Sequence, residues 1–424
     1  MNKPLNRWLV ATMGTLLMMC LGTVYAWSYF QTPLCETYQW TNSQVAWAFS
    51  LAICFLGLAA AVGGMILPRT GPTRLAVLGG LLFGTGYLLG AQALRLHSLP
   101  LLYFGYGVVG GTGLGLGYVT PVACVAKWFP DRKGFATGMV VMGFGFGALL
   151  MSKVIAPFLM ARTAGNLVNV FAVLGVGFLV VNVAVAAFVR NPPPGWLPAG
   201  YTPPAVAAGA KAVAADATVR GSILSGRFTL MWWIFFCNIT AGISIIGFQS
   251  PLLQDICRKA SPGLSKEALA GYGATLIAVS SLFNGAGRFL WGGISDRIGR
   301  RLTFSLILGT QLVAFAGLLY TGNPWLFSAL VCYVLLCYGG GFGTMPSFVL
   351  DVFGSRVMPA VYGTILTAWS AAGIVGPQLV AVIKDRYPAA TLPGRASFYS
   401  FAMGAGFLSV GLILSLLSGN RRRE

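Results

Sequence analysis

Twelve long apolar stretches dominate this sequence and constrain its fold more than any other feature. A hydrocarbon core about 30 Å thick requires about 20 apolar residues of α-helix, and each stretch is long enough to cross it. Only 9% of the 424 residues are charged, which is too few for the surface of a soluble protein of this size. The chain is therefore predicted to be an all-α integral membrane protein with 12 transmembrane helices. The approximate limits of the stretches are 8–31, 43–67, 74–95, 99–126, 134–160, 166–189, 228–254, 268–291, 302–321, 325–350, 358–383 and 396–418.

One connection between the stretches is much longer than the others. Residues 190–227 contain a run of three prolines and an alanine-rich segment, and this composition is typical of a linker. The linker separates residues 1–189 from residues 228–424, and each part holds six apolar stretches. A weak internal repeat relates the two parts, because a shift of 225 residues places Pro121 on Pro346. We therefore expect two similar six-helix halves joined by a cytoplasmic linker.

The formal net charge of +19 comes mostly from residues between the apolar stretches. If both termini are cytoplasmic, the cytoplasmic loops hold 18 of the 28 Lys and Arg residues and the outer loops hold 9. The positive-inside rule favours this orientation, so membrane topology explains the charge and we expect no nucleic-acid partner. The first stretch is longer than the apolar region of a signal peptide and is expected to remain as a span. We expect a multi-pass protein of the cell membrane, in a bacterium the inner membrane.

Residues that commonly carry catalysis or bind metals are scarce. The eight cysteines are scattered without metal-ligand spacing, and His97 is the only histidine. The sequence also holds no cofactor motif. We therefore expect neither an enzyme nor a metal or cofactor site, and no obligate protein partner is evident.

Arg288 carries the strongest indication of a binding site. It lies eight residues before Asp296, so an α-helix places it about 12 Å deeper in the membrane. A guanidinium near the middle of a bilayer costs at least about 2.5 to 3.5 kcal/mol and needs a partner or a water-filled cavity. No acidic residue lies at comparable depth in any apolar stretch. A guanidinium binds a carboxylate through two parallel hydrogen bonds, so we expect a small carboxylate anion as ligand, with a structural arginine paired to backbone carbonyls as the alternative.

The segment between the eighth and ninth stretches reads Gly-Gly-Ile-Ser-Asp-Arg-Ile-Gly-Arg-Arg from Gly292 to Arg301. It resembles the loop signature G-x-L-x-D-R-x-G-R-R of the major facilitator superfamily. The aspartate can pair with arginines and cap a helix N-terminus, so the segment is predicted to latch one conformational state. The predicted latch consists of Asp296, Arg297, Gly299 and Arg300. The corresponding segment of the first half has Pro68 in place of the aspartate.

A second block extends from Trp128 to Gly138 and is followed by the glycine-rich residues 143–147. Together with the segment Tyr25-Ala26-Trp27-Ser28, it resembles the monocarboxylate transporter and oxalate/formate antiporter branch of that superfamily. The resemblance implies the major facilitator fold, with a substrate cavity between two six-helix halves near the midplane.

Polar and aromatic residues from several stretches are candidates for lining this cavity. Asn284 lies one helical turn before Arg288 and shares its face. Tyr25 and Tyr29 have i,i+4 spacing, as do Tyr338 and Phe342. Phe144 and Trp369 occupy equivalent positions in the internal repeat. Besides Arg288 and Asn284, the predicted lining residues are Tyr118, Tyr25, Tyr29, Tyr338, Phe342, Phe144 and Trp369.

Departures from the relatives narrow the expected substrate. Proton-coupled monocarboxylate transporters usually carry aspartate at the place of Asn284 and a lysine near the place of Tyr29, and oxalate carriers carry lysine at the place of Trp369. Two cations suit a dianion, whereas one cation beside an aromatic wall suits a small monoanion with an apolar tail. The single cation therefore favours a small monocarboxylate such as lactate or pyruvate. The resemblance to the monocarboxylate transporters implies symport of this anion with a proton, and carboxylate exchange of the oxalate/formate type is the alternative.

Overall fold

The computed structural model describes residues 5–131, 133–198, 200–201, 218–354, 357–388, 391–392 and 394–417. Throughout these residues the regular secondary structure is helical. The segment η1 is a 3-10 helix, whereas η2 and η3 are π-helices. In chain order the helices are α1 (Arg7–Gly22), η1 (Thr23–Ala26), α2 (Trp27–Tyr38), α3 (Asn42–Thr70), α4 (Pro72–Arg95), α5 (Leu99–Leu102), η2 (Tyr103–Gly110), α6 (Gly111–Trp128), α7 (Lys133–Leu150), η3 (Met151–Ile155), α8 (Ala156–Arg162), α9 (Leu167–Ala186), α10 (Val219–Ile223), α11 (Gly226–Ala260), α12 (Lys266–Ile298), α13 (Arg300–Tyr320), α14 (Pro324–Phe353), α15 (Met358–Ile365), α16 (Thr367–Arg386) and α17 (Arg395–Leu417).

Twelve helical segments of the described residues are long and apolar enough to cross a membrane, which confirms the predicted all-α membrane fold. Several segments extend past the apolar stretches. The first ends at Tyr38 rather than near residue 31, and the eighth ends at Ile298 rather than near residue 291. Hydropathy marks only the part of a helix that lies in hydrocarbon, whereas backbone hydrogen bonding continues into the polar region.

Polar residues fix where the long helices begin. Thr41 accepts a hydrogen bond from the backbone of Gln44, and the Gln44 side chain accepts one from the backbone of Thr41, which forms a capping box before α3. Ser225 and Ser265 cap α11 and α12 in the simpler way, through one side-chain acceptor each.

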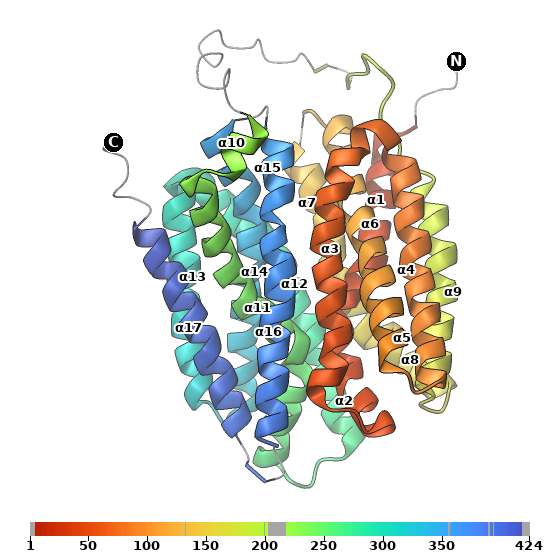
Figure 1. The fold of residues 1–424 in the computed structure, drawn as a ribbon, viewed down its shortest axis with the longest axis vertical. Helices are drawn as coiled ribbons and strands as arrows, with labels where there is room; N and C mark the ends of the chain where they lie inside the picture. The colour runs from red at the N-terminus through yellow and green to blue at the C-terminus, as the bar shows by residue number, and fades with distance from the viewer. Residues whose placement is uncertain are drawn as a thin grey trace.

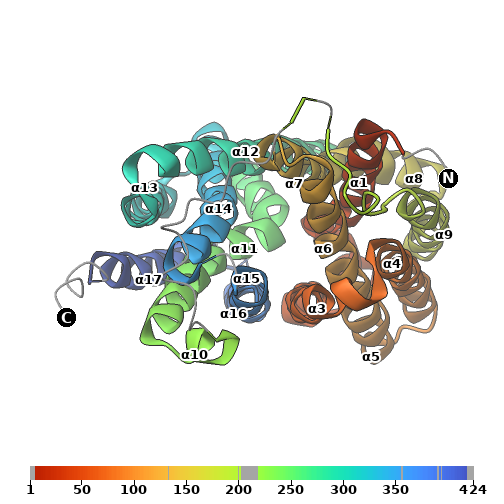
Figure 2. The same cartoon turned by 90° about the horizontal axis from the view of Figure 1, so that it is seen from above.

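The helices gather into two bundles. Figure 2 shows α1 to α9 on one side of the molecule and α10 to α17 on the other, and we call these the N-bundle and the C-bundle. Of the predicted linker 190–227, residues 199 and 202–217 lie outside the described residues, and the remainder includes α10. The helix α1 begins and α17 ends toward the upper end of the molecule in Figure 1, the end that also holds α10. We call this end the terminal face and the opposite end, where α2 ends, the far face.

The bundles meet along two main helix pairs, α3 with α16 and α7 with α12. Small residues allow the close approach in the first pair, since a Cβ atom on Gly57 would lie 2.3 Å from the hydroxyl oxygen of Ser370. That hydroxyl donates a hydrogen bond of 2.8 Å to the carbonyl of Cys54 across the seam. Side chains at the centre of this seam form the candidate site.

Candidate functional site

Arg288 lies inside α12 with only 8% of its surface exposed. Its Nη1 atom donates a hydrogen bond of 3.4 Å to the hydroxyl of Tyr118, which belongs to α6 of the opposite bundle. Its guanidinium carbon lies 5.0 Å from the centre of the Phe342 ring, a distance that allows a cation–π interaction. No ion pair found among the described residues includes Arg288. In the described part of the chain, the positive charge therefore has hydroxyl and aromatic partners and no carboxylate.

Aromatic side chains from both bundles surround this guanidinium. The Tyr25 and Tyr338 hydroxyls share a hydrogen bond of 2.8 Å that joins the N-bundle to the C-bundle. The ring of Tyr118 packs against Trp369 with centroids 5.6 Å apart, and Trp369 packs against Phe342 at 4.8 Å. On the N-bundle side, Phe144 contacts both Tyr25 and Tyr118. We call this group the Arg288 cluster, and its members are Tyr25, Tyr118, Phe144, Arg288, Tyr338, Phe342 and Trp369.

Every member of the Arg288 cluster is buried. Arg288 is the most exposed at 8%, and Phe144, Tyr338 and Trp369 show no exposed surface. Hydrogen bonds and ring contacts across the seam hold the two bundles together at this level. A ligand can reach the guanidinium only if the bundles separate on one face or the other.

Two glycines bring the backbone of α14 against α12 beside the cluster. A Cβ atom on Gly339 would lie 2.0 Å from the carbonyl oxygen of Asn284, and one on Gly343 would lie 2.3 Å from that of Arg288. Asn284 is itself buried, and its Oδ1 atom has no hydrogen-bond partner among the described residues. The structure therefore places the predicted residue Asn284 one turn from Arg288, at the contact between α12 and α14.

The structure does not bring Tyr29 into the cluster. Tyr29 packs on Phe30 and lines a cavity of about 240 Å³ on the far face, together with Glu36 and Lys266. The i,i+4 spacing from Tyr25 fails as a guide because Tyr25 lies in η1, whereas Tyr29 lies in the α-helix α2 that follows it. A 3-10 turn has 3.0 residues rather than 3.6, so the faces before and after it no longer align.

Tyr362 is a neighbour of the cluster that the sequence prediction missed. It lies on α15, close enough to Arg288 and Tyr118 to interact with both electrostatically. The sequence could have pointed to Tyr362 through its spacing, because a residue seven positions before Trp369 lies on the same face of a regular helix. That signal is weak here, because α15 and α16 are separate helices on either side of Leu366.

The predicted latch lies at the terminal face, between α12 and α13. Asp296 and Arg300 form an ion pair of 2.6 Å, and Arg300 also binds Asp351 of α14 at 3.1 Å. The φ angle of Gly299 is +88°, a conformation that favours glycine, and Gly299 is also the N-cap of α13. The expectation that Asp296 caps a helix N-terminus is therefore wrong, because Asp296 lies in the last turn of α12.

The ion pairs and side-chain hydrogen bonds of this loop stay within the C-bundle in the described part of the chain. Arg301 donates hydrogen bonds to the backbone carbonyls of Ser415 and Leu416 at the end of α17. Arg297 is exposed. The sequence prediction missed both Asp351 and the end of α17 as partners, since each lies on another helix. In the second predicted block, Arg132 and the side chains of residues 133–135 lie outside the described residues.

Comparisons with known proteins agree with this architecture. Residues 8–377 match the family model of the Major Facilitator Superfamily. The chain is 27% identical to the oxalate:formate antiporter of Oxalobacter formigenes, over 94% of this chain and 90% of that protein. It is 27% identical to apicoplast pyruvate carrier 1 of Toxoplasma gondii, over 83% of this chain and 79% of that protein. It is 24% identical to monocarboxylate transporter 11 of Mus musculus, over 91% of this chain and 82% of that protein.

A solved structure shows the same fold at lower identity. The crystal structure of a bacterial homologue of the human lysosomal transporter Spinster, in an inward-facing and unoccupied conformation, superposes with a TM-score of 0.70. The identity is 16%, and the match covers 98% of this chain and 97% of that one. With twelve membrane-crossing segments and a family match over most of its length, the chain belongs to the Major Facilitator Superfamily of membrane transporters.

Proposed function

We propose that the protein is a secondary active transporter of small monocarboxylates such as lactate and pyruvate. The observation that carries this proposal is the buried guanidinium of Arg288, which has no carboxylate partner among the described residues and sits where the two bundles meet. A substrate carboxylate supplies the missing partner through two parallel hydrogen bonds. The printed names of the relatives, a pyruvate carrier among them, support the same class of substrate.

The composition of the cluster favours a monoanion with a short apolar tail. The cluster has one cation, and its remaining members are aromatic side chains that contribute three hydroxyl groups and one indole N–H. One carboxylate neutralises the single guanidinium, while the rings of Phe144, Phe342 and Trp369 pack against a methyl or carbonyl group. A second carboxylate has no cation to pair with here.

Transport then follows from the free energy of the closed state. An empty cluster buries an uncompensated charge whenever the bundles close, and a bound carboxylate removes that cost. The loaded carrier therefore passes through the closed state more readily than the empty one. The predicted latch of Asp296 and Arg300 joins α12 to α14 inside the C-bundle, so it acts by keeping this bundle rigid while the two bundles move.

Proton-coupled symport is our first choice of mechanism. The cluster contains no carboxylate that could take up a proton, so the proton travels on the substrate carboxyl group or on a polar group beside Arg288. We place the terminal face on the cytoplasmic side of a cell membrane, in a bacterium the inner membrane, because the positive-inside rule favours that orientation.

Carboxylate exchange is the second candidate. A cluster with one fixed cation and no acidic residue is chemically sufficient for anion exchange, and the oxalate:formate antiporter matches 94% of this chain. Purified protein in vesicles separates the two mechanisms. Symport predicts that an acid-outside gradient stimulates uptake of labelled L-lactate into vesicles without internal anion, whereas exchange predicts uptake only when the vesicles are preloaded with a carboxylate. Equal uptake with and without the gradient contradicts symport.

A further inference from the structure

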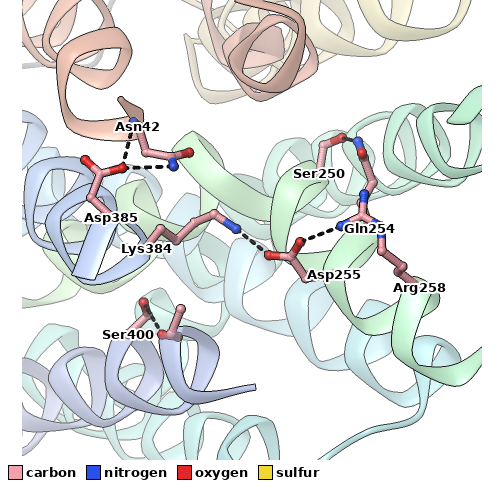
Figure 3. A network of polar contacts seen from close by, with 9 residues as sticks. Asn42, Ser250, Gln254, Asp255, Arg258, Lys384, Asp385 and Ser400 are labelled. Carbon is pink, nitrogen blue, oxygen red and sulfur yellow. Dashed lines mark hydrogen bonds and ion pairs between the residues drawn. The ribbon is translucent and has the colours of Figure 1, made fainter. Parts of the chain in front are cut away.

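We propose that Asp385 is a latch that holds the far face of the transporter closed. Asp385 lies in the last turn of α16, in the C-bundle, and its carboxylate binds the first turn of α3 in the N-bundle. Its Oδ1 atom accepts hydrogen bonds from the backbone N–H of Asn42 at 2.8 Å and from the Asn42 side chain at 3.0 Å. Its Oδ2 atom accepts a third from the backbone N–H of Ser43 at 2.8 Å. Figure 3 shows Asn42 and Asp385 facing one another.

The start of α3 is well suited to a carboxylate. The first N–H groups of a helix have no partner within the helix, and the helix dipole places partial positive charge there. Within the 29-residue helix α3, the capping box of Thr41 satisfies only the N–H of Gln44 in the first turn. Asp385 accepts hydrogen bonds from the N–H groups of Asn42 and Ser43, the two residues before Gln44. One bundle therefore supplies the donors and the other supplies the anion.

A second set of charges holds Asp385 in place on the C-bundle. Its neighbour Lys384 forms an ion pair with Asp255 near the end of α11, and Asp255 also contacts Arg258 at 3.4 Å. Figure 3 shows both cationic side chains pointing at Asp255. The side chains of Lys384 and Asp255 are only 11% and 19% exposed, so solvent screens this pair less than a surface pair. The end of α16 is thus fixed to α11 while it binds α3.

Among the described residues, the contacts between the bundles that involve a carboxylate lie at the far face. Besides Asp385 with α3, Glu36 of α2 binds Lys266 of α12 at 3.3 Å. At the terminal face, Arg7 pairs with Asp131 inside the N-bundle, and Arg300 pairs inside the C-bundle. In the described part of the chain, carboxylate contacts therefore join the two bundles at the far face, whereas the carboxylates at the terminal face pair within one bundle. Opening the far face requires the carboxylate of Asp385 to leave the start of α3.

The Glu36–Lys266 pair provides a matched control. It crosses the same seam at the same face, but both side chains are more than half exposed, at 54% and 81%. Exposed pairs of this kind contribute little to stability. Glu36→Gln and Asp385→Asn each remove one negative charge from the far face. If the two variants change the separation of the bundles by different amounts, the cause is where the carboxylate binds and not the loss of charge itself.

Distances between spin labels test the latch without any substrate, so the outcome does not depend on which anion is carried. Labels on Thr37→Cys of α2 and Ser261→Cys beside α11 report the separation of the bundles at the far face, in the full chain in liposomes with its eight native cysteines replaced by alanine. We expect Asp385→Asn to raise the ratio of long to short distances by about tenfold, in the range typical of conformational coupling. Glu36→Gln is expected to leave the distribution close to that of the parent.

A second variant removes the donors instead of the acceptor. Proline is tolerated at the first position of a helix, and Thr41 already has the extended backbone that suits a residue before proline, with ψ of 160°. Asn42→Pro therefore keeps α3 and deletes two of the three hydrogen bonds to Asp385. We expect it to shift the distances in the same direction as Asp385→Asn. Unchanged distances in either variant, or an equal shift in Glu36→Gln, overturn the assignment of Asp385 as the latch.

Discussion

Arg288 of α12 and Tyr118 of α6 form a hydrogen bond of 3.4 Å across the seam between the two bundles. The buried charge of one bundle is thus in direct contact with a hydroxyl of the other. Any motion that separates the bundles changes the surroundings of this guanidinium, which links the binding site to the conformational change.

The Tyr25–Tyr338 hydrogen bond is expected to stabilise the closed state. Tyr25→Phe and Tyr338→Phe each remove one hydroxyl, and a buried hydrogen bond of this kind contributes about 0.5 to 1.5 kcal/mol. We expect each variant to lower the thermal stability of the purified protein slightly. The double variant is expected to lose less than the sum of the two single losses, because both changes break the same bond. Strictly additive losses in melting temperature would show that the two hydroxyls act independently.

Trp369 is expected to set the preference for a monoanion. Trp369→Lys introduces a second cation beside Tyr118 and Phe342, where it can pair with a second carboxylate. We expect the ratio of oxalate uptake to lactate uptake to rise by about tenfold, the effect of about 1.4 kcal/mol of differential binding. Trp325→Lys is the matched control, because Trp325 is 80% exposed at the start of α14. An unchanged uptake ratio in Trp369→Lys contradicts this role.

The contact between α12 and α14 is expected to tolerate no side chain at Gly339. Gly339→Ala places a methyl group 2.0 Å from the carbonyl oxygen of Asn284, so α14 must move away from α12. Overpacking of this kind costs about 1 to 3 kcal/mol. We expect a lower melting temperature and reduced lactate uptake. Gly293→Ala on α12 is the control, because nothing lies within 4 Å of a Cβ atom at that position. Equal behaviour of the two variants would contradict the close contact.

Arg300 is expected to hold the terminal ends of α12 and α14 together. Arg300→Ala removes its bonds to Asp296 and Asp351, whereas the control Arg74→Ala changes an exposed arginine in the first turn of α4, outside the predicted latch. Both carboxylates are more than half exposed, so the loss in stability is expected to be below about 1 kcal/mol. The larger expected effect is on the transport rate, because these bonds fix the terminal end of α12, the helix that carries Arg288. A transport rate in Arg300→Ala equal to that of Arg74→Ala would argue against a latch at this loop.

The fold could be predicted from the sequence because few backbone structures can cross a lipid bilayer. Twelve apolar stretches of sufficient length imply twelve helices, and the structure agrees with that count in the residues it describes. Arg288 could be singled out in the same way, since a buried charge without an acidic neighbour has a large and identifiable cost.

The remaining parts of the site depend on how the helices pack, which a local pattern does not encode. Tyr29 was expected beside Tyr25, but the 3-10 turn η1 rotates the following helix away from the cluster. Asp385 and Asn42 are 343 positions apart and meet only because the two bundles dock at the far face. Tyr362 was missed because its spacing to Trp369 is interrupted by the break between α15 and α16.

The role of Arg288 can be tested by uptake of labelled L-lactate into vesicles that contain the wild type, Arg288→Lys or Arg95→Lys. Lysine keeps the charge but cannot form the two parallel hydrogen bonds of a guanidinium. We expect Arg288→Lys to lower uptake by at least about tenfold, the effect of about 1.4 kcal/mol of lost binding. We expect Arg95→Lys, at an exposed position in the last turn of α4, to transport like the wild type. Equal uptake by Arg288→Lys and the wild type would show that Arg288 does not bind the substrate carboxylate.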